Sequence, residues 1–98
     1  MKIWDKELID KFTDKHTDAS SAFQCCWIDI VEDAEWKSHA ELKMSFPSAD
    51  YVGNNRYVFN IRGNNYRMVV VVVFIAGMLK IRFLGTHAEY DKVDCKTI

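Results

Sequence analysis

The apolar residues at the start of the chain recur at helical spacing. Trp4, Leu8 and Phe12 follow one another at intervals of four residues, with mostly polar residues between them. Side chains three or four residues apart lie on one face of a helix, so the pattern predicts a helix over residues 5–16 with one apolar stripe. Residues 1–3 fit a short edge strand before this helix.

A second helix is predicted after the first. Thr17, Asp18 and Ser20 have side chains of the kind that cap helix N-termini. Beyond them, apolar residues again recur at spacings of three and four as far as about residue 36, with carboxylates on the other side. We expect this helix to share a core with the first and to turn its acidic side toward solvent.

The second half of the chain alternates with period two, which is typical of β-strands. In residues 57–62, one set of side chains points to one face and the other set to the opposite face. The first set is Tyr57, Phe59 and Ile61, and the second is Val58, Asn60 and Arg62. Residues 66–75 are almost entirely apolar and predict a central strand that is covered on both faces. Residues 79–83 alternate again, with Lys80 and Arg82 between apolar neighbours.

Turn signals separate these strands. Gly-Asn-Asn stands at residues 53–55 and again at 63–65, and Ala-Gly stands at 76–77. Glycine and asparagine tolerate the positive φ angles that tight hairpin turns require. After the last strand, Thr86 can cap a short helical turn over residues 86–91.

These patterns predict one α+β domain over residues 1–98. Two N-terminal helices pack on one face of a small antiparallel sheet of three to five strands, and a short C-terminal helix follows. The alternation then gathers a polar and cationic set on the other face of the sheet, which consists of Asn60, Arg62, Arg67, Lys80 and Arg82.

The composition narrows the classes of protein. Hydrophobic residues make up 49% of the chain and charged residues 28%, which excludes a disordered segment. The longest apolar run, residues 68–78, is about half as long as the ~20 residues that a membrane-spanning helix requires. The first residues are charged and contain no apolar signal segment, so we expect a cytoplasmic protein.

The net charge of −1 conceals an asymmetry. Residues 1–50 hold 6 basic and 11 acidic residues, whereas residues 51–98 hold 7 basic and 3 acidic ones, including all four arginines. Two explanations of this charge split stay open at this point. Either residues 1–50 form a solvated helical layer beside a sheet, or the basic residues 51–98 bind an anionic partner.

No metal or cofactor site is predicted. Cys25 and Cys26 are adjacent, Cys95 stands alone, and the three histidines are scattered. None of these residues has the spacing of zinc ligands or of a disulfide framework. The motifs of phosphate-binding loops, serine hydrolases and zinc proteases do not occur in the sequence.

The chemistry with most support is RNA cleavage. Cleavage without a metal needs a base for the ribose 2′-OH, an acid for the leaving 5′-oxygen, and cations for the charge of the transition state. Alone, His87 is explained as a capping or surface residue, and Tyr90 as a packing residue with a wet hydroxyl. Beside several arginines, the two residues supply the groups that this reaction requires.

Two long segments, FPSADYVGNNRYVFNIRGNNYRMVV and IRFLGTHAEYDKVD, resemble the HigB-type toxins of bacterial toxin–antitoxin modules, within the RelE/ParE superfamily. The resemblance covers residues 36–98, and the helical first part fits in layout. It implies a small α+β fold and an mRNA interferase that cuts message on the translating ribosome. It also implies a HigA-type helix-turn-helix antitoxin, and contact with DNA only through that antitoxin. It implies no association with a membrane and no cofactor.

The resemblance further implies roles for single residues. Arg67 stands where relatives place an arginine at the scissile phosphate. His87 and Tyr90 fall where the superfamily has its C-terminal catalytic residues. The candidates for RNA contact are Asn60, Arg62, Lys80 and Arg82.

Two features depart from the family pattern. Val58 and Asn60 occupy the strand that carries catalytic lysines in RelE itself, so the same acid–base scheme cannot operate unchanged. The sequence pI of about 6.3 is also lower than that of strongly basic interferases. Two alternatives therefore stay open, an antitoxin-binding module without nuclease activity and a ParE-like gyrase poison.

Overall fold

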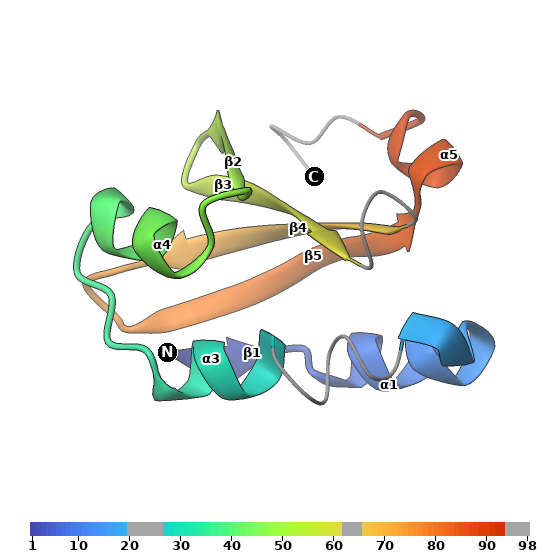
Figure 1. The fold of residues 1–98 in the computed structure, drawn as a ribbon, viewed down its shortest axis with the longest axis horizontal. Coiled ribbons are helices and arrows are strands. Elements are labelled where there is room, and N and C mark those ends of the chain that lie inside the picture. Colours follow the sequence, from blue (N-terminus) through green and yellow to red (C-terminus); the bar gives the residue numbers. More distant parts are fainter. Residues whose placement is uncertain (20–26, 62–65, 94–98) are drawn as a thin grey trace.

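The structure, a computed structural model, describes residues 1–19, 27–61 and 66–93. Figure 1 shows a single sheet with helices along one of its faces. In chain order the elements are β1 (Lys2–Trp4), α1 (Glu7–Lys15), the 3-10 turn η1 (Thr17–Ala19), α3 (Ile28–Asp33), α4 (His39–Ser45), β2 (Asp50–Gly53), β3 (Arg56–Ile61), β4 (Tyr66–Val73), β5 (Met78–Thr86) and α5 (His87–Tyr90).

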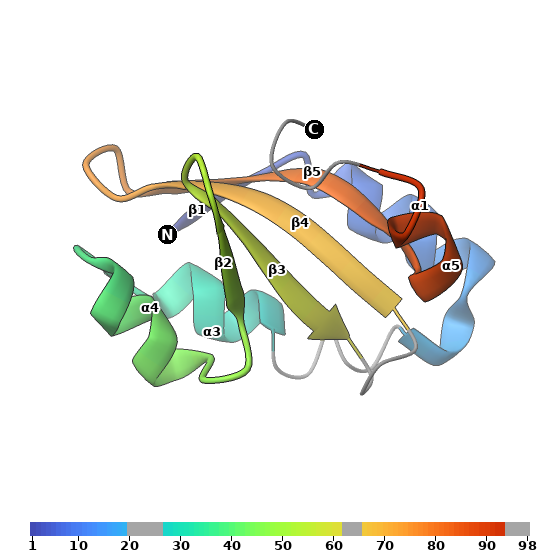
Figure 2. The same cartoon turned by 90° about the horizontal axis from the view of Figure 1, so that it is seen from above.

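The sheet has five strands in the order β1-β5-β4-β3-β2, which can be followed in Figure 2. Strands β2 to β5 form the expected antiparallel meander. The prediction of an entirely antiparallel sheet is wrong, because β1 pairs with β5 in parallel, with Ile3 opposite Leu79. Period-two alternation fixes which side chains share a face and carries no information about strand direction. The sheet is therefore mixed.

Strand β4 lies in the middle of the sheet, as its apolar sequence predicts. It pairs with β3 along one edge and with β5 along the other. Met68 and Val70 are fully buried against the helices, and Val69 is fully buried on the opposite face. A strand covered on both faces requires an unbroken apolar run, which the polyvaline segment provides.

The helical layer differs from the expected pair of N-terminal helices. Helix α1 lies within the predicted range of residues 5–16. The predicted second helix is wrong in its C-terminal part, because α3 ends at Asp33 and the backbone becomes extended at Ala34, with ψ of 145°. The beginning of that predicted helix, residues 20–26, lies outside the described residues.

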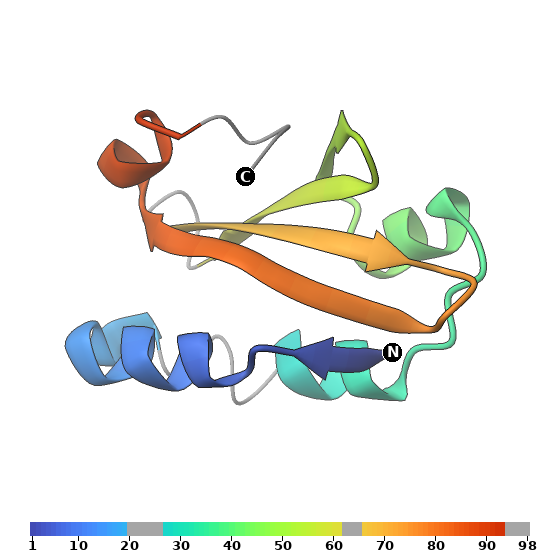
Figure 3. The ribbon, with the colours of Figure 1, turned by 180° about the vertical axis from the view of Figure 1, so that it is seen from behind.

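A further helix, α4, follows where none was predicted. The Ser38 hydroxyl caps it by accepting a hydrogen bond from the Glu41 backbone N–H at 3.5 Å. Serine followed three residues later by glutamate is a recognised helix-start pattern, so the sequence does contain a signal for α4. Helices α1 and α3 lie along one face of the sheet (Figures 1 and 3).

The core between the helices and the sheet is centred on Phe59 of β3. Trp27 and Phe46 both meet its ring edge to face, with ring centroids 5.8 and 5.1 Å apart. Leu42 of α4 and Val31 of α3 are fully buried in the same cluster. One alternation set of β3, which consists of Tyr57, Phe59 and Ile61, belongs entirely to this core.

The turn before β3 has the predicted chemistry. Gly53, Asn54 and Asn55 all adopt positive φ angles, of 96°, 53° and 61°. Gly77, just before β5, likewise has a positive φ, of 66°. The second predicted Gly-Asn-Asn turn, at residues 63–65, lies outside the described residues.

Within the part of the chain that the structure describes, no helix is both long enough and apolar enough to span a membrane.

Helix α4 offers a matched test of the core. Leu42→Ala removes a fully buried side chain, so we expect a loss of about 2–5 kcal/mol in the free energy of unfolding, measured by urea denaturation. Met44→Ala on the same helix removes a side chain that is 82% exposed and should change stability by less than about 0.5 kcal/mol. Equal losses for the two variants would contradict the placement of α4.

Candidate functional site

The start of helix α5 is fixed to the end of β5 by a capping box. The Thr86 hydroxyl accepts a hydrogen bond from the Glu89 backbone N–H at 3.3 Å. In return, the Glu89 carboxylate accepts one from the Thr86 backbone N–H at 3.0 Å. This confirms the predicted cap, and it holds the helix at the end of the sheet opposite the β4–β5 turn (Figure 2).

Arg67 lies on the central strand beneath this helix. Its neighbours across the sheet are Asn60 of β3 and Gly85 of β5. A Cβ atom on Gly85 would lie only 2.8 Å from Phe83 Cζ and 3.1 Å from Glu89 Oε1. The absence of a side chain at residue 85 therefore lets α5 fold back close to the strand that carries Arg67.

The fold brings Arg67 and Tyr90 together. The guanidinium carbon of Arg67 lies 4.8 Å from the centroid of the Tyr90 ring, and Phe83 packs near the same ring at 6.4 Å. A guanidinium stacked on an aromatic ring is held by its flat face, while its N–H donors point outward in its own plane. Arg67 is thus oriented without losing all the donors that bind a phosphate.

Two polar atoms beside this contact are buried and have no hydrogen-bond partner among the described residues. They are Nε of Arg67 and Oδ1 of Asn60, which belong to directly opposed residues of β4 and β3. An unsatisfied buried polar atom costs about 1–3 kcal/mol, and such atoms are concentrated at functional sites. This end of the sheet therefore carries polar atoms that the described part of the chain does not satisfy.

His87 is the third member of the site. Its ring centroid lies 6.4 Å from that of Tyr90. Its Nδ1 is 3.6 Å from a carboxylate oxygen of Asp91, one helical turn further along, and its side chain is 46% exposed.

The structure gathers only part of the predicted set. Arg67, Asn60, His87 and Tyr90 meet at the β5–α5 end. Lys80 pairs across the sheet with Val71, which is four residues or about 13 Å from Arg67 along β4. Its amino group instead lies 4.0 Å from the carboxylate of Asp5.

The other two arginines of the set stand apart from this group. Arg82 is exposed and has no partner residue across β4, because Phe83 pairs with Val69 and Ile81 pairs with Val70. It forms a β-bulge, which simple alternation does not predict. Arg62 lies outside the described residues. RNA contact by Lys80, Arg82 or Arg62 stays a prediction.

The face of the sheet opposite the helices is less polar than expected. At its centre, Val58, Val69 and Phe83 form one row across three strands, and both valines are buried. Asn60 and Arg67 lie at one end of this face, and Lys80 lies toward the other end. The alternation of side chains along each strand predicts which cations share a face, but it does not bring these cations together at one site.

Three residues near the site escaped the sequence analysis. Asp91 follows His87 by four residues on a short helix, so the spacing contained a usable signal. Lys15 and His16 belong to α1, yet both act electrostatically on Glu89. Their approach depends on packing of α1 beside α5, which no local pattern reveals.

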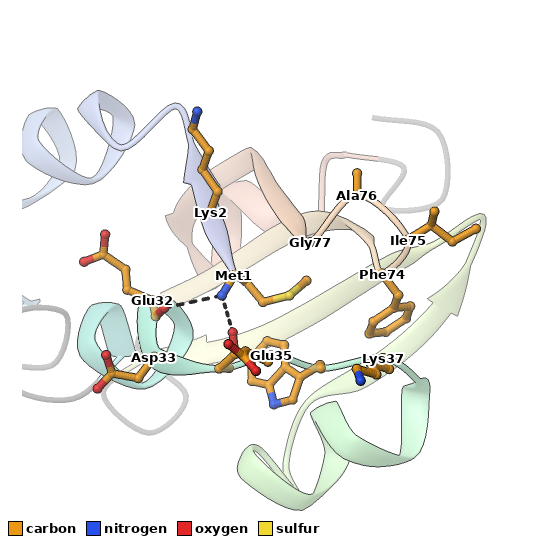
Figure 4. Close-up of a pocket in the computed structure, with 12 residues that line it drawn as sticks. Met1, Lys2, Glu32, Asp33, Glu35, Lys37, Phe74, Ile75, Ala76 and Gly77 are labelled. Atoms are coloured by element: carbon orange, nitrogen blue, oxygen red, sulfur yellow. Dashed lines mark hydrogen bonds between the residues drawn. The ribbon is translucent and has the colours of Figure 1, made fainter.

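A hollow of the described structure lies elsewhere. It has a volume of about 560 Å³ and opens beside the β4–β5 turn, with Phe74 to Gly77 on one side (Figure 4). The Met1 amino group donates there to the backbone carbonyls of Val31, Glu32 and Ala34. Carboxylates line the other side, at Glu32, Asp33 and Glu35. The same lining holds Lys2, Lys37 and the Met1 amino group, so the charges around the hollow balance and it has no excess of positive charge for RNA phosphates.

Metal ligands were not expected from the sequence. Among the described residues, no three side chains of His, Cys, Asp or Glu gather in a way that could hold a metal ion. Cys25, Cys26 and Cys95 lie outside those residues, so the predictions about them stay untested.

Comparison with known proteins gives a consistent result. Residues 24–93 match the HigB toxin family model, described as the RelE-like toxic component of a toxin–antitoxin system. Over 59 residues the chain is 42% identical to the mRNA interferase toxin HigB of Escherichia coli K12, which covers 57% of this chain and 56% of that protein. The mRNA interferase HigB of Shigella flexneri matches to the same extent.

A second relative is more distant but matches slightly more of the chain. The mRNA interferase HigB of Escherichia coli O6:H1 is 27% identical over 66 residues, or 65% of this chain and 64% of that protein. The chain thus spans between about half and two thirds of the length of the relatives it matches.

The cap of α5 predicts a pH dependence. Hydrogen bonds from the Thr86 backbone and hydroxyl lower the pKa of Glu89 below its ordinary value of 4.5, with a smaller effect of Lys15 and His16. A carboxylate with a lowered folded-state pKa stabilises the fold fully above its unfolded pKa, and this stabilisation is lost as the pH falls through the lowered value.

We therefore expect the Thr86 amide NMR signal to shift, and α5 to loosen, only below about pH 4.5. Glu89→Gln keeps an acceptor oxygen but removes the titrating group, so the same signal should stay constant in that variant. An identical titration in both proteins would show that another group controls the cap.

Proposed function

The chain belongs to the HigB family of RelE-like toxins, and from this premise we propose that it is the toxin of a type II toxin–antitoxin system that cuts mRNA on the translating ribosome. The observation that carries the proposal is the contact of Arg67 with Tyr90, 4.8 Å from guanidinium carbon to ring centroid. It joins a cation from the sheet to two proton-exchanging side chains on α5.

In the proposed reaction, the ribose 2′-OH attacks the adjacent phosphorus and the bond from phosphorus to the 5′-oxygen breaks. Arg67 binds the phosphate oxygens and stabilises the negative charge that builds up on them. His87 and Tyr90 divide the two proton transfers, one taking the proton from the 2′-OH and the other protonating the leaving 5′-oxygen. No step of this scheme needs a metal ion.

The small net charge is compatible with this proposal. The second half of the chain carries the arginines, and the acidic residues Glu32, Asp33 and Glu35 border the hollow beside the opposite, β4–β5 turn end. Local potential at a site depends on nearby charges more than on the total. We propose that RNA approaches the β5–α5 end, and that the ribosome presents it there.

The family relationship also supports a protein partner. We propose a HigA-type helix-turn-helix antitoxin that neutralises the toxin, with DNA contact made only by the antitoxin. The near-neutral pI of about 6.3 favours, as the second candidate, an antitoxin-binding module that does not cut RNA. A gyrase poison of the ParE type is the third possibility that an experiment should separate.

The decisive experiment is induced expression without antitoxin, followed by genome-wide mapping of mRNA 5′ ends. We expect growth arrest with new ends inside translated messages. Arg67→Ala should reduce cutting about 100-fold or more, because it removes the charge at the phosphate. Tyr90→Phe and His87→Gln should each reduce it about 100- to 10,000-fold, since each removes a proton-transfer group.

Lys37→Ala is the matched control, because Lys37 is an exposed cation that lines the hollow beside the β4–β5 turn. It should cut as wild type does. Arrest with DNA damage and no new mRNA ends would indicate gyrase poisoning, and no arrest would indicate a binding module. Wild-type cutting by the Arg67→Ala, Tyr90→Phe double variant would refute the proposed site.

Dependence on the ribosome has a separate test. We expect the purified chain to cut a message bound to ribosomes at least ~10-fold faster than the same message free in solution. The physical reason is that a chain with net charge −1 lacks the excess of positive charge that binds free RNA tightly. Equal rates would place the whole RNA-binding surface on this chain alone.

A further inference from the structure

A second hollow has the lining of a nucleobase pocket. It lies beside edge strand β2 and is formed by His39, Tyr51, Asn55, Tyr57 and Phe74, with a volume of about 290 Å³. We propose that this aromatic hollow binds one unpaired base of a single-stranded RNA by stacking. The proposal rests on the proposed function, since it assigns a subsite to the RNA that the chain cuts.

The floor of the hollow is rigid and uncharged. Tyr57 is 1% exposed, and its hydroxyl is 2.7 Å from His39 Nδ1 in a hydrogen bond. The two rings are stacked, with centroids 5.6 Å apart and planes 27° apart. Burial and the neighbouring Tyr51 raise the pKa of the Tyr57 hydroxyl above its ordinary value of 10.0, so this hydroxyl stays protonated.

The wall is an aromatic ring that solvent reaches. Tyr51 is 52% exposed, yet its position is fixed by pairing with Tyr57 across β2 and β3. Its ring centroid lies 5.1 Å from that of Tyr57 and 5.5 Å from that of His39, which it meets at 68°. An exposed and preoriented ring of this kind is what an unpaired base stacks on.

The rim supplies groups that fit a nucleotide. Asn55 contributes a side-chain amide, which can donate to and accept from the edge of a base. None of the five lining residues is acidic. The next residue, Arg56, begins β3, and its guanidinium donates to the Asn54 carbonyl at 3.0 Å. Arg56 belongs to the alternation set opposite to that of Tyr57, so its side chain lies on the other face of β3 and does not line the hollow.

The hollow and Arg67 lie on opposite faces of the sheet. Tyr57 pairs with Val70, whose side chain faces the helices, whereas Arg67 pairs with Asn60 on the other face. Strand spacing of ~4.8 Å and rise of ~3.3 Å give a Cα separation of roughly 14 Å between Arg67 and Tyr51, which lies two strands away. Because β2 is an edge strand, an RNA strand that binds at both places has to pass around this edge of the sheet.

The test measures binding without cleavage. A fluorescein-labelled hexanucleotide with 2′-O-methyl riboses cannot be cut, because the attacking hydroxyl is blocked. We expect Tyr51→Ala to weaken its binding at least about 5-fold in fluorescence anisotropy, as loss of one stacked base does. Tyr51→Phe keeps the ring and should bind as wild type does.

Asn55→Gly is the second variant, because glycine keeps the left-handed backbone with φ of 61° and removes only the amide. It should weaken binding for oligonucleotides of some base compositions and not others. In addition, a 4-thiouridine-substituted oligonucleotide should form its ultraviolet cross-link with the peptide that contains Tyr51.

The outcomes separate this inference from the proposed function. If the oligonucleotide binds equally to wild type and Tyr51→Ala, or cross-links elsewhere, the hollow is not an RNA subsite, whether or not mRNA is cut in cells. If Tyr51→Ala instead weakens binding of the antitoxin alone, the hollow is a protein-docking site and the inference falls. If binding depends on Tyr51 but no mRNA is cut in cells, the hollow is still supported as an RNA subsite, and the proposed nuclease activity is contradicted.

Discussion

The pairing of β4 on both of its edges is the constraint on which the rest of the structure depends. Residues Tyr66 to Val71 pair with both β3 and β5, and the strand carries apolar side chains on both faces. Helices α1, α3 and α4 all pack against the same side of this sheet. Because the strand cannot shift without losing both ladders, Arg67 near its beginning has a fixed backbone position.

The candidate site follows from bringing a helix to that fixed point. Gly85 leaves the space, the Thr86–Glu89 cap sets where α5 begins, and Tyr90 then meets the guanidinium of Arg67. The buried Nε of Arg67 and Oδ1 of Asn60 stay without a hydrogen bond in the described part of the chain. Of these two atoms only the Arg67 N–H is a donor that a phosphate oxygen can accept from, and the Asn60 oxygen needs a donor from another group.

The distribution of charge agrees with this arrangement. The acidic first half of the chain forms α1, α3 and the segment leading to α4, and part of it lines the hollow beside the β4–β5 turn. The arginines belong to the sheet half. The two explanations of the charge split are therefore compatible, since a solvated helical layer and an anion-binding end of the sheet occupy different places on one small domain.

Strands β1, β3, β4 and β5, the central place of β4, the first helix and the Thr86 cap could be predicted from the sequence, because they depend on local periodicity and on side chains that bond within three residues. Arg67, His87 and Tyr90 were also candidates from the sequence. The folded chain alone shows strand β2, the parallel pairing of β1 with β5, the bulge that isolates Arg82, and the contact of Arg67 with Tyr90 rather than with Lys80. Strand direction, bulges and stacking are set by contacts between residues far apart in the chain, and an alternating pattern is the same whichever of these contacts form.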